Sequence, residues 1–365
     1  MIALARSEPE VLVRPEQLDA DPMSLNVDNG TIDLRTARLD EHSRASLCTK
    51  LVPIAFDPEA QCPRWLKFLD EVFAGDATRV DFVQRWFRYS LTGLTSEQCL
   101  PLLIGSGSNG KTTLLEMLRL LLGEYAVQSD FSTFLAKAAR GPRNDLARLF
   151  GARVVTSSEA GEDKRLDESL IKQITGDEVI AARKLYQESF EYQPTFKVWL
   201  AANHRPVIRE TDLGIWRRIR LIPFDVVIQP ARRDKDLRAK LTAELSGILG
   251  WALDGCLAWQ RDGLGTPAIV QEATDEYRVD SDVLGAFLEE CCERAPHYRE
   301  NATMLYDAYR TWTDRNGVRA ITSTAFGRKL KELGYDKEKI GRVARIGLRL
   351  RTRIADGLDG SGPIL

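Results

Sequence analysis

Apolar residues in the middle of the chain form short continuous runs that are separated by stretches with helical spacing. The short runs, which are typical of buried strands, lie at 102–104, 154–157, 197–201 and 219–223. Helical spacing fills the segments between them. This alternation predicts an α/β fold in which a parallel sheet spans the stretch 96–262.

The pattern before this core is different. Asn29-Gly30 lies between two extended segments, which is the strongest short signal for a β-hairpin. Helical spacing follows at 65–73 and 81–91. We therefore expect residues 1–95 to form an N-terminal segment of mixed α and β structure that serves oligomerisation.

The pattern after the last strand predicts a small helical lid. Helical spacing at 235–249 and 250–259 would close the α/β core. The sequence Gly-Leu-Gly-Thr-Pro at 263–267 is the clearest break in the chain. It opens a polar stretch, 263–280, that we expect to be a linker containing a short polar helix.

The last region predicts a winged-helix domain over 281–356, followed by a disordered tail at 357–365. Three helical patterns are followed by extended segments up to Arg353, which is the order of a winged helix. The helical patterns lie at 283–292, 303–315 and 323–333.

The composition is that of a soluble globular protein of two or three domains. The 365 residues are 44% apolar and 28% charged, and no apolar run approaches the roughly 20 residues that a membrane helix needs. The first 13 residues carry three charges, so no secretory signal is visible. Six cysteines without Cys-x-x-Cys spacing favour buried thiols over a zinc site or disulfides. We therefore expect a cytoplasmic protein with no membrane partner.

Residues 105–112 carry the clearest chemical signal. They read Gly-Ser-Gly-Ser-Asn-Gly-Lys-Thr between an apolar strand and a helix, which is the arrangement of a phosphate-binding loop rather than of a coincidental turn. Lys111 would neutralise the β- and γ-phosphates of ATP, and the hydroxyl of Thr112 would bind Mg²⁺. The residues expected to bind the nucleotide are Gly105, Ser106, Gly107, Ser108, Asn109, Gly110, Lys111, Thr112 and Thr113.

Polar residues near the ends of the later strands complete a candidate catalytic set. Glu159 follows the run 154–157, where the acid of a P-loop ATPase binds Mg²⁺ or orients the attacking water. Asn203 follows the next strand, where its amide can reach the γ-phosphate. Arg217 or Arg218 could supply an arginine finger to a neighbouring subunit. An ordinary surface glutamate and a solvated basic face are the alternatives.

Five motifs in this order resemble those of the superfamily 3 helicases, in particular the primase-helicase type of phages, plasmids and poxviruses. The segments 25–30 and 53–63 also resemble the part that precedes the helicase core in that family. The five motifs are the phosphate loop and the segments 153–159, 172–177, 200–206 and 216–220.

The resemblance implies an AAA+-like P-loop core that assembles as a ring around DNA, usually a hexamer, and translocates 3′ to 5′. This chain has Ser158 where members of the superfamily often have a second acid, so Glu159 would serve both metal and water. By resemblance, Gly110, Lys111 and Thr112 match the Walker A loop, Glu159 the Walker B acid, Asn203 the sensor amide, and Arg217 or Arg218 the finger.

Two basic segments are candidates for contact with DNA. Helicases of this type project a basic hairpin into the ring channel, and Arg183 and Lys184 lie at the matching position. The stretch 328–353 holds ten basic and three acidic residues, a net charge of +7 in a chain of net charge −2. Ordinary surface charge and a protein-docking winged helix are the respective alternatives. The residues of this stretch that we expect on DNA are Arg328, Lys329, Lys331, Arg345 and Arg349.

The sequence therefore favours an ATP-driven replicative DNA helicase of phage, prophage or plasmid origin, which binds single-stranded and duplex DNA. An AAA+ initiator that melts or remodels an origin without processive unwinding is a second hypothesis. A DNA-binding protein whose nucleotide only sets its oligomeric state is a third. The chain has no room for a primase domain before residue 23, so priming would belong to a separate protein or to a longer product.

Overall fold

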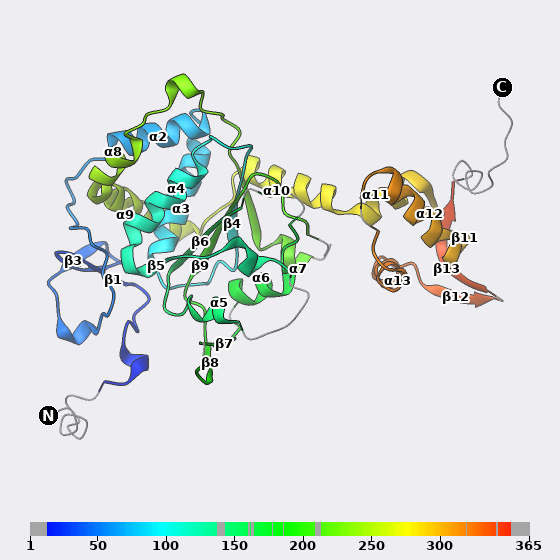
Figure 1. Cartoon of the computed structure of the whole chain (residues 1–365), viewed down its shortest axis with the longest axis horizontal. Helices are drawn as coiled ribbons and strands as arrows, with labels where there is room; N and C mark the ends of the chain where they lie inside the picture. The colour runs from blue at the N-terminus through cyan, green and yellow to red at the C-terminus, as the bar shows by residue number, and fades with distance from the viewer. Residues whose placement is uncertain are drawn as a thin grey trace. The chain divides into compact units, whose positions relative to one another are not determined.

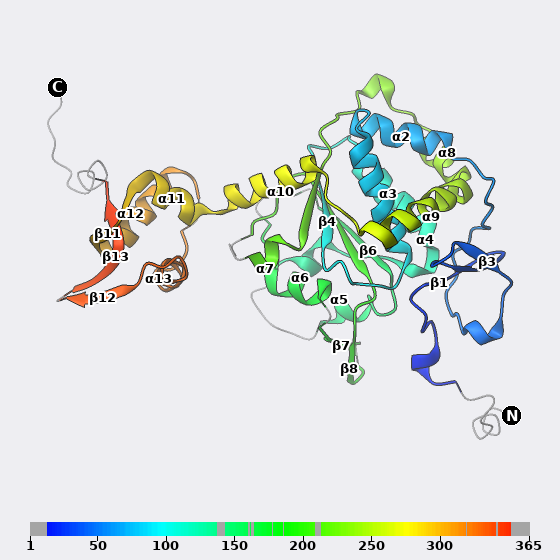
Figure 2. The same cartoon turned by 180° about the vertical axis from the view of Figure 1, so that it is seen from behind.

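The computed structural model divides the chain into two compact units, Met1–Arg278 and Val279–Leu365, and each is described here by itself (Figures 1 and 2). The tail expected to be disordered, 357–365, lies outside the described residues. The residues that the structure describes are 13–136, 143–159, 161, 164–176, 178–184, 186–208, 213–318, 320–340 and 342–351.

A five-stranded sheet forms the centre of the first unit, in the order β10-β4-β9-β6-β5. Every neighbouring pair is parallel, so all five strands end at the same edge. The α/β fold with a parallel sheet is thereby confirmed. The strands are β4 (Leu100–Ile104), β5 (Ala126–Gln128), β6 (Val154–Glu159), β9 (Lys197–Ala202) and β10 (Ile219–Pro223).

Helices cover both faces of this sheet (Figures 1 and 2). Successive strand residues point to opposite faces, so Leu103 packs with residues of α2, α3, α4 and α9, whereas Leu102 packs with residues of α5, α6 and α7. No helix in the described part of the chain is both long and apolar enough to cross a membrane. The helices are α2 (Pro63–Phe73), α3 (Ala77–Leu91), α4 (Lys111–Leu122), α5 (Asn144–Ala147), α6 (Glu168–Thr175), α7 (Leu213–Trp216), α8 (Leu237–Ala243), α9 (Leu245–Asp262) and α10 (Ala268–Ser281).

The N-terminal segment shares its hydrophobic core with the sheet. The expected hairpin is present, with Asp28 and Asn29 as the turn. Farther along, the rings of Trp86 in α3 and Trp199 in β9 lie 5.7 Å apart. Residues before and after position 95 are therefore parts of one unit. The three strands of the small sheet in this segment are β1 (Ser24–Val27), β2 (Gly30–Asp33) and β3 (Arg38–Asp40).

The lid differs from the expected pattern in where its helices meet. The break falls at Glu244 rather than before Gly250, which lies inside α9. The carboxylate of Glu244 accepts hydrogen bonds from the backbone N–H groups of Arg64 (3.0 Å) and Trp65 (2.9 Å). Glu244 thus caps the amino end of α2, and this tertiary contact sets the position of the break.

Most of the stretch expected to be a linker, 263–280, packs as the helix α10. Val270 and Tyr277 are buried in the core, and Thr274 accepts a hydrogen bond from the backbone of Leu221 in β10. The boundary between the two units therefore lies at Arg278.

A two-stranded hairpin precedes β9 and projects from the body of the unit (Figures 1 and 2). It consists of β7 (Ile180–Arg183) and β8 (Ser189–Tyr192), which pair antiparallel. Because β9 begins five residues after β8 ends, the hairpin lies at the amino edge of the sheet, opposite the edge where the phosphate loop begins.

The second unit contains the three expected helices and a three-stranded antiparallel sheet in the order β11-β13-β12. The strand β11 was not expected, because its sequence is polar and carries no apolar run. The helices and the sheet enclose a small core in which Phe287 contacts Tyr309 and Phe326. The elements are α11 (Val283–Cys291), β11 (Cys292–Asn301), α12 (Ala302–Arg315), α13 (Ser323–Glu332), β12 (Lys337–Ile340) and β13 (Arg342–Leu350).

Candidate functional site

The phosphate loop joins the end of β4 to the first turn of α4. Gly107 and Gly110 have φ values of +99° and +90°, a region that side chains disfavour. A Cβ atom at Gly110 would also lie 2.5 Å from the side chain of Val72, so only glycine fits. The amide of Asn109 donates to the carbonyl of Phe224 at 3.0 Å and holds the loop against the segment after β10.

Lys111 is the buried cation of this loop, with 5% of its surface exposed. Its Nζ donates to the carbonyl of Gly105 (2.5 Å) and to the side-chain oxygens of Asn109 (3.0 Å) and Asn203 (3.4 Å). Among the described residues no carboxylate pairs with it. Burial lowers the pKa of Lys111 to about 8. A buried ammonium whose partners among the described residues are all neutral oxygens is a fitting partner for a phosphate group.

The ends of β9 and β6 bring the next two candidates toward this ammonium. Asn203 follows β9 directly, and its side-chain oxygen is one of the three that Lys111 contacts. Glu159 is the last residue of β6 and pairs in register with Ala202, the residue before Asn203. The backbone thus places Glu159 at the same edge of the sheet, while its side chain is outside the described part.

Three other residues of the phosphate loop have exposed side chains. Thr112, expected to bind Mg²⁺, lies in the first turn of α4 with its side chain exposed, next to Lys111. Ser106 and Ser108 are exposed as well, and the hydroxyl of Ser108 accepts a hydrogen bond of 3.0 Å from Arg233.

The two candidate finger residues have different surroundings. Arg217 is exposed, and its guanidinium makes no hydrogen bond or ion pair to any described residue. Arg218 is half-buried in the turn after α7 and donates to the carbonyl of Gly214 in that helix at 2.6 Å. A finger must reach a neighbouring subunit, so this difference favours Arg217 over Arg218.

A pocket of about 240 Å³ next to the phosphate loop is a feature that sequence reasoning missed. It is assembled from three parts of the chain, namely α2, the loop, and the segment between β10 and α8, so no local motif announces it. Apolar and charged side chains alternate around it. The lining residues are Arg64, Phe68, Glu71, Ser108, Gly110, Thr113, Ile228, Arg232, Arg233, Asp234 and Leu237.

The hairpin candidates Arg183 and Lys184 lie at the end of β7 and in the turn that follows. Both side chains are exposed, and Arg183 donates to the carbonyl of Gln187 across the turn at 3.0 Å. The structure thus presents two cations at the tip of the projecting hairpin.

Arg345, expected on DNA, is instead a buried residue with 2% of its surface exposed. Its guanidinium donates to the carbonyls of Tyr335 (2.7 Å) and Gly327 (2.5 Å), and thereby ties α13 to β13. The expectation for Arg345 is corrected, because a guanidinium used in this way cannot meet a phosphate.

The remaining basic candidates of the second unit are at its surface. Arg328 and Lys331 in α13 are exposed and Lys329 is half-buried. Arg349 in β13 pairs with Glu293 and lies 4.3 Å from the centre of the Tyr298 ring. The helix α13 thus places two exposed basic residues and one half-buried one at the surface of this unit.

Three family profiles match consecutive parts of the chain. Residues 1–74 match the family described as D5 N terminal like, and residues 279–343 match the family described as Poxvirus D5 protein-like. Residues 103–218, which hold the phosphate loop and Asn203, match a family of unknown function.

Viral proteins are similar in sequence to this chain. A candidate helicase of Acanthamoeba polyphaga mimivirus, L207/L206, is 26% identical over 82% of this chain and 34% of its own length. A candidate helicase of Frog virus 3, 022R, is 28% identical over 73% of this chain and 29% of its own length. A candidate primase of African swine fever virus, C962R, is 28% identical over 56% of this chain. The chain spans about a third of the length of the helicase relatives.

The fold has a counterpart among solved structures. The C-terminal region of NrS-1 superimposes with a TM-score of 0.53 and 12% identity over 90% of this chain and 83% of that structure. This structural match shows the fold alone. The D5 profiles and the viral relatives confirm the resemblance to superfamily 3 helicases of the viral primase-helicase type, and specify the D5 kind.

Proposed function

We propose that this chain is the motor part of a DNA helicase that hydrolyses ATP with Mg²⁺. The observation that carries the proposal is the convergence of Lys111 and Asn203 at the edge of the sheet where Glu159 also ends. A phosphate-binding loop, a sensor amide and an acid at one sheet edge are the parts that phosphoryl transfer needs. The helicase-like relatives support the same assignment.

The residues around the loop fit a nucleotide and its metal. Lys111 would hold the β- and γ-phosphates, because it is a buried cation without a carboxylate partner among the described residues. Thr112 and Glu159 would hold Mg²⁺, which shields the phosphate charge. The nucleoside would extend into the pocket between α2 and the segment before α8, where Ile228 and Leu237 offer apolar surface.

The proposed working form is an AAA+-like ring, with a hexamer as the expected size. In a ring, the exposed Arg217 of one subunit would reach the nucleotide of the next. The hairpin would face DNA in the channel and translocation would run 3′ to 5′. The phage, prophage or plasmid origin and a setting in the bacterial cytoplasm are part of the proposal, as is a separate primase.

The second unit is proposed as a winged helix that docks on duplex DNA. Its order of elements, helix, strand, two helices and two strands, supports this assignment. The helix α13 would enter a groove, with Arg328, Lys329 and Lys331 near phosphates and Arg349 on the adjoining strand.

The test is the unwinding of forked DNA by the purified chain, with Lys111→Ala as the inactive control. ATP-dependent unwinding that requires a 3′ tail supports the proposal. Hydrolysis without unwinding would favour an initiator that remodels DNA. ATP binding without hydrolysis would favour a DNA-binding protein that the nucleotide merely switches.

A further inference from the structure

Exposed aromatic side chains lie at the tip of the β7–β8 hairpin and on the turn that follows α5. Tyr186, at the tip, has 98% of its surface exposed, and Phe150, after α5, has 59% exposed. Phe150 packs edge-on against Phe190 and Tyr192 of β8, with ring centres 5.8 and 5.4 Å apart. Large exposed rings on a soluble surface mark a site of interaction.

The backbone at Tyr186 suggests that its ring is there for a partner. Its φ is +59°, in the left-handed region that an aromatic residue rarely occupies and that glycine or asparagine adopts more readily. The ring makes no aromatic contact with a described residue. A ring that is almost fully exposed and disfavours its own backbone is explained most simply by a ligand.

The charges of the hairpin indicate which kind of interaction this surface can make. Arg183 and Lys184 are exposed on one side of the turn, and Glu188 and Glu191 are exposed on the other. The hairpin is therefore close to neutral. Attraction to phosphates alone would give it little affinity for DNA, so a single strand bound here would need contacts to its bases as well.

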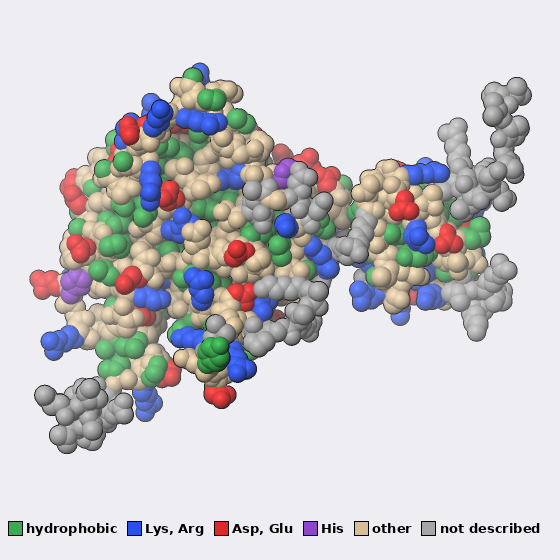
Figure 3. Space-filling model, in the orientation of Figure 1, with side chains coloured by type: hydrophobic (Ala, Val, Ile, Leu, Met, Phe, Trp, Pro, Cys, Tyr) green, Lys and Arg blue, Asp and Glu red, His purple; other side chains and the backbone are tan. Residues whose placement is uncertain are grey.

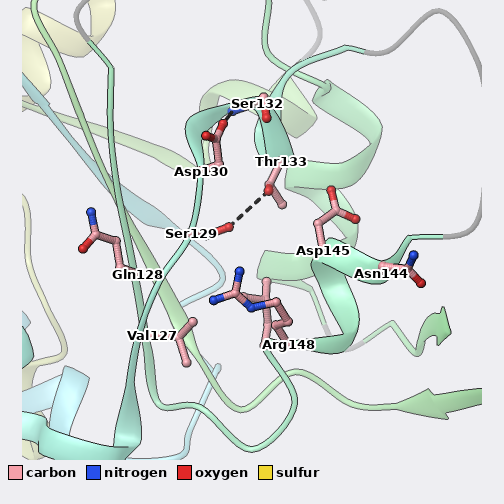
Figure 4. A pocket seen from close by; sticks show the side chains of 10 residues that line it. Val127, Gln128, Ser129, Asp130, Ser132, Thr133, Asn144, Asp145 and Arg148 are labelled. Atoms are coloured by element: carbon pink, nitrogen blue, oxygen red, sulfur yellow. Dashed lines mark hydrogen bonds between the residues drawn. The ribbon is translucent and has the colours of Figure 1, made fainter. Parts of the chain in front are cut away.

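The turn next to Phe150 carries a further exposed cation, Arg148. Arg148 is exposed and lines a polar pocket of about 320 Å³ (Figure 4). Figure 4 shows its guanidinium below Ser129 and Thr133, which are joined by a hydrogen bond of 3.1 Å. The carboxylate of Asp145 on the same wall already pairs with Arg143. Arg148 pairs with no described carboxylate.

We propose that this surface is a stacking platform for single-stranded DNA, in which bases stack on Tyr186 and Phe150 while a phosphate binds Arg148. The proposal rests on the proposed function, whose DNA-facing hairpin it extends to the turn after α5. Figure 3 shows hydrophobic and basic side chains side by side on the projecting hairpin, as a stacking platform requires. Stacking is tolerant of sequence, because every base offers a ring face.

Fluorescence anisotropy with three 20-nucleotide strands tests the proposal on the full chain with a non-hydrolysable ATP analogue. The strands are oligo-dA, oligo-dT and one with abasic sites that keeps the backbone but lacks bases. Tyr186→Asn fits the left-handed backbone without a ring, and Tyr186→Phe is its matched control. Phe150→Leu keeps an apolar side chain against Phe190 but removes the ring face, and Phe150→Tyr is its control.

We expect Tyr186→Asn and Phe150→Leu each to weaken binding of oligo-dA by about tenfold, with little effect on the abasic strand. Both ring-keeping controls should bind like the wild type. Arg148→Ala should weaken all three strands alike and reduce the slope of log affinity against log salt by about 0.7. Equal losses on oligo-dA and abasic DNA, or wild-type affinity in Tyr186→Asn, would overturn stacking.

Sedimentation of the same variants separates DNA from the other partner that could cover these rings, a second subunit. A loss of oligomers in Tyr186→Asn without DNA would overturn the platform in favour of a subunit contact. Failure of the proposed function would give a different set of results from failure of the platform. A wild type that does not hydrolyse ATP, yet binds oligo-dA more tightly than abasic DNA through Tyr186, would refute the motor and support the platform.

Discussion

The Nζ atom of Lys111 lies 3.4 Å from the side-chain oxygen of Asn203, although the two residues are 92 positions apart in the chain. The parallel sheet accounts for this contact, because β4 and β9 are neighbours that end at the same edge. The loop after β4 turns its lysine toward the residue that follows β9. The contact joins the loop that would hold phosphates to the strand that would sense them.

The lowered pKa of Lys111 predicts proton uptake when a nucleotide binds. At pH 8.5 a group with a pKa of about 8 is mostly neutral, and a bound phosphate would restore its charge. ADP binding at this pH should therefore take up roughly three quarters of a proton. Calorimetry in buffers of different ionisation enthalpy measures the uptake. Lys111→Arg, which does not titrate in this range, should show none, and equal uptake in that variant would assign the proton to another group.

The same pKa predicts how stability depends on pH without ligand. The folded pKa of about 8 lies below the unfolded value of 10.5, so the unfolded chain binds more protons between these values. The free energy of unfolding should therefore gain up to about 3 kcal/mol from this residue as the pH rises through that window. Urea titrations give the free energy of unfolding of the wild type and of Lys111→Met, whose side chain does not titrate. The difference between these two free energies should shrink over the same pH range.

Glu159→Gln should bind ATP and hydrolyse it at least about a hundredfold more slowly than the wild type, because an amide cannot act as the base for the attacking water. Equilibrium binding and steady-state hydrolysis measure the two effects. Ser158→Ala is the matched neighbour and should retain most activity. Comparable losses in the two variants would place the critical acid elsewhere.

Arg217 and Arg218 should fail in different ways when replaced by alanine. Arg217→Ala should fold and bind nucleotide normally but lose hydrolysis, since its exposed guanidinium would serve a neighbouring subunit. Mixing it with Lys111→Ala subunits, which keep the finger, should restore part of the activity. Arg218→Ala should instead lower the melting temperature, because this side chain holds the carbonyl of Gly214. An absence of rescue at every mixing ratio would contradict a role in trans.

Removal of the second unit, by ending the chain at Arg278, should weaken binding to duplex DNA and flatten its dependence on salt. Hydrolysis of ATP stimulated by single-stranded DNA should remain. Within the full chain, Lys331→Ala should weaken duplex binding with little change in stability. Arg345→Ala should do the opposite and destabilise the unit by about 1–3 kcal/mol, because it leaves two carbonyls without a partner. Duplex binding that survives the truncation would refute the docking role.

The proposed nucleoside pocket predicts that one substitution changes the affinities for two ligands differently. Leu237→Ala should lower the affinity for ADP several-fold through the loss of apolar contact, and should leave the affinity for inorganic tripolyphosphate unchanged. Parallel calorimetric titrations provide the comparison. A similar loss for both ligands would show that the nucleoside lies elsewhere.

The parts of this structure that follow from local chemistry were predictable from the sequence. Alternating apolar runs predicted the sheet, and the position of Asn203 after a strand led to the expectation that its amide reaches the γ-phosphate. The structure adds a direct contact between Asn203 and Lys111, which arises because parallel strands end at one edge. Features that depend on distant partners were not. The burial of Arg345 depends on the carbonyls of Gly327 and Tyr335, and the end of α8 depends on the cap that Glu244 provides for α2.

Between the hairpin and Asn203 lies β9, whose amino end is anchored by the buried Lys197. The Nζ of Lys197 donates to the carbonyls of Thr92 and Leu94, and β4 and β6 hold the strand on either side. If this strand slid along its own axis, the buried Lys197 would lose its hydrogen bonds to both carbonyls. A motor built on this unit would therefore move whole subunits against one another rather than shift this strand within a subunit. In the proposed ring, the hairpin that precedes β9 would then move together with the sheet of its own subunit.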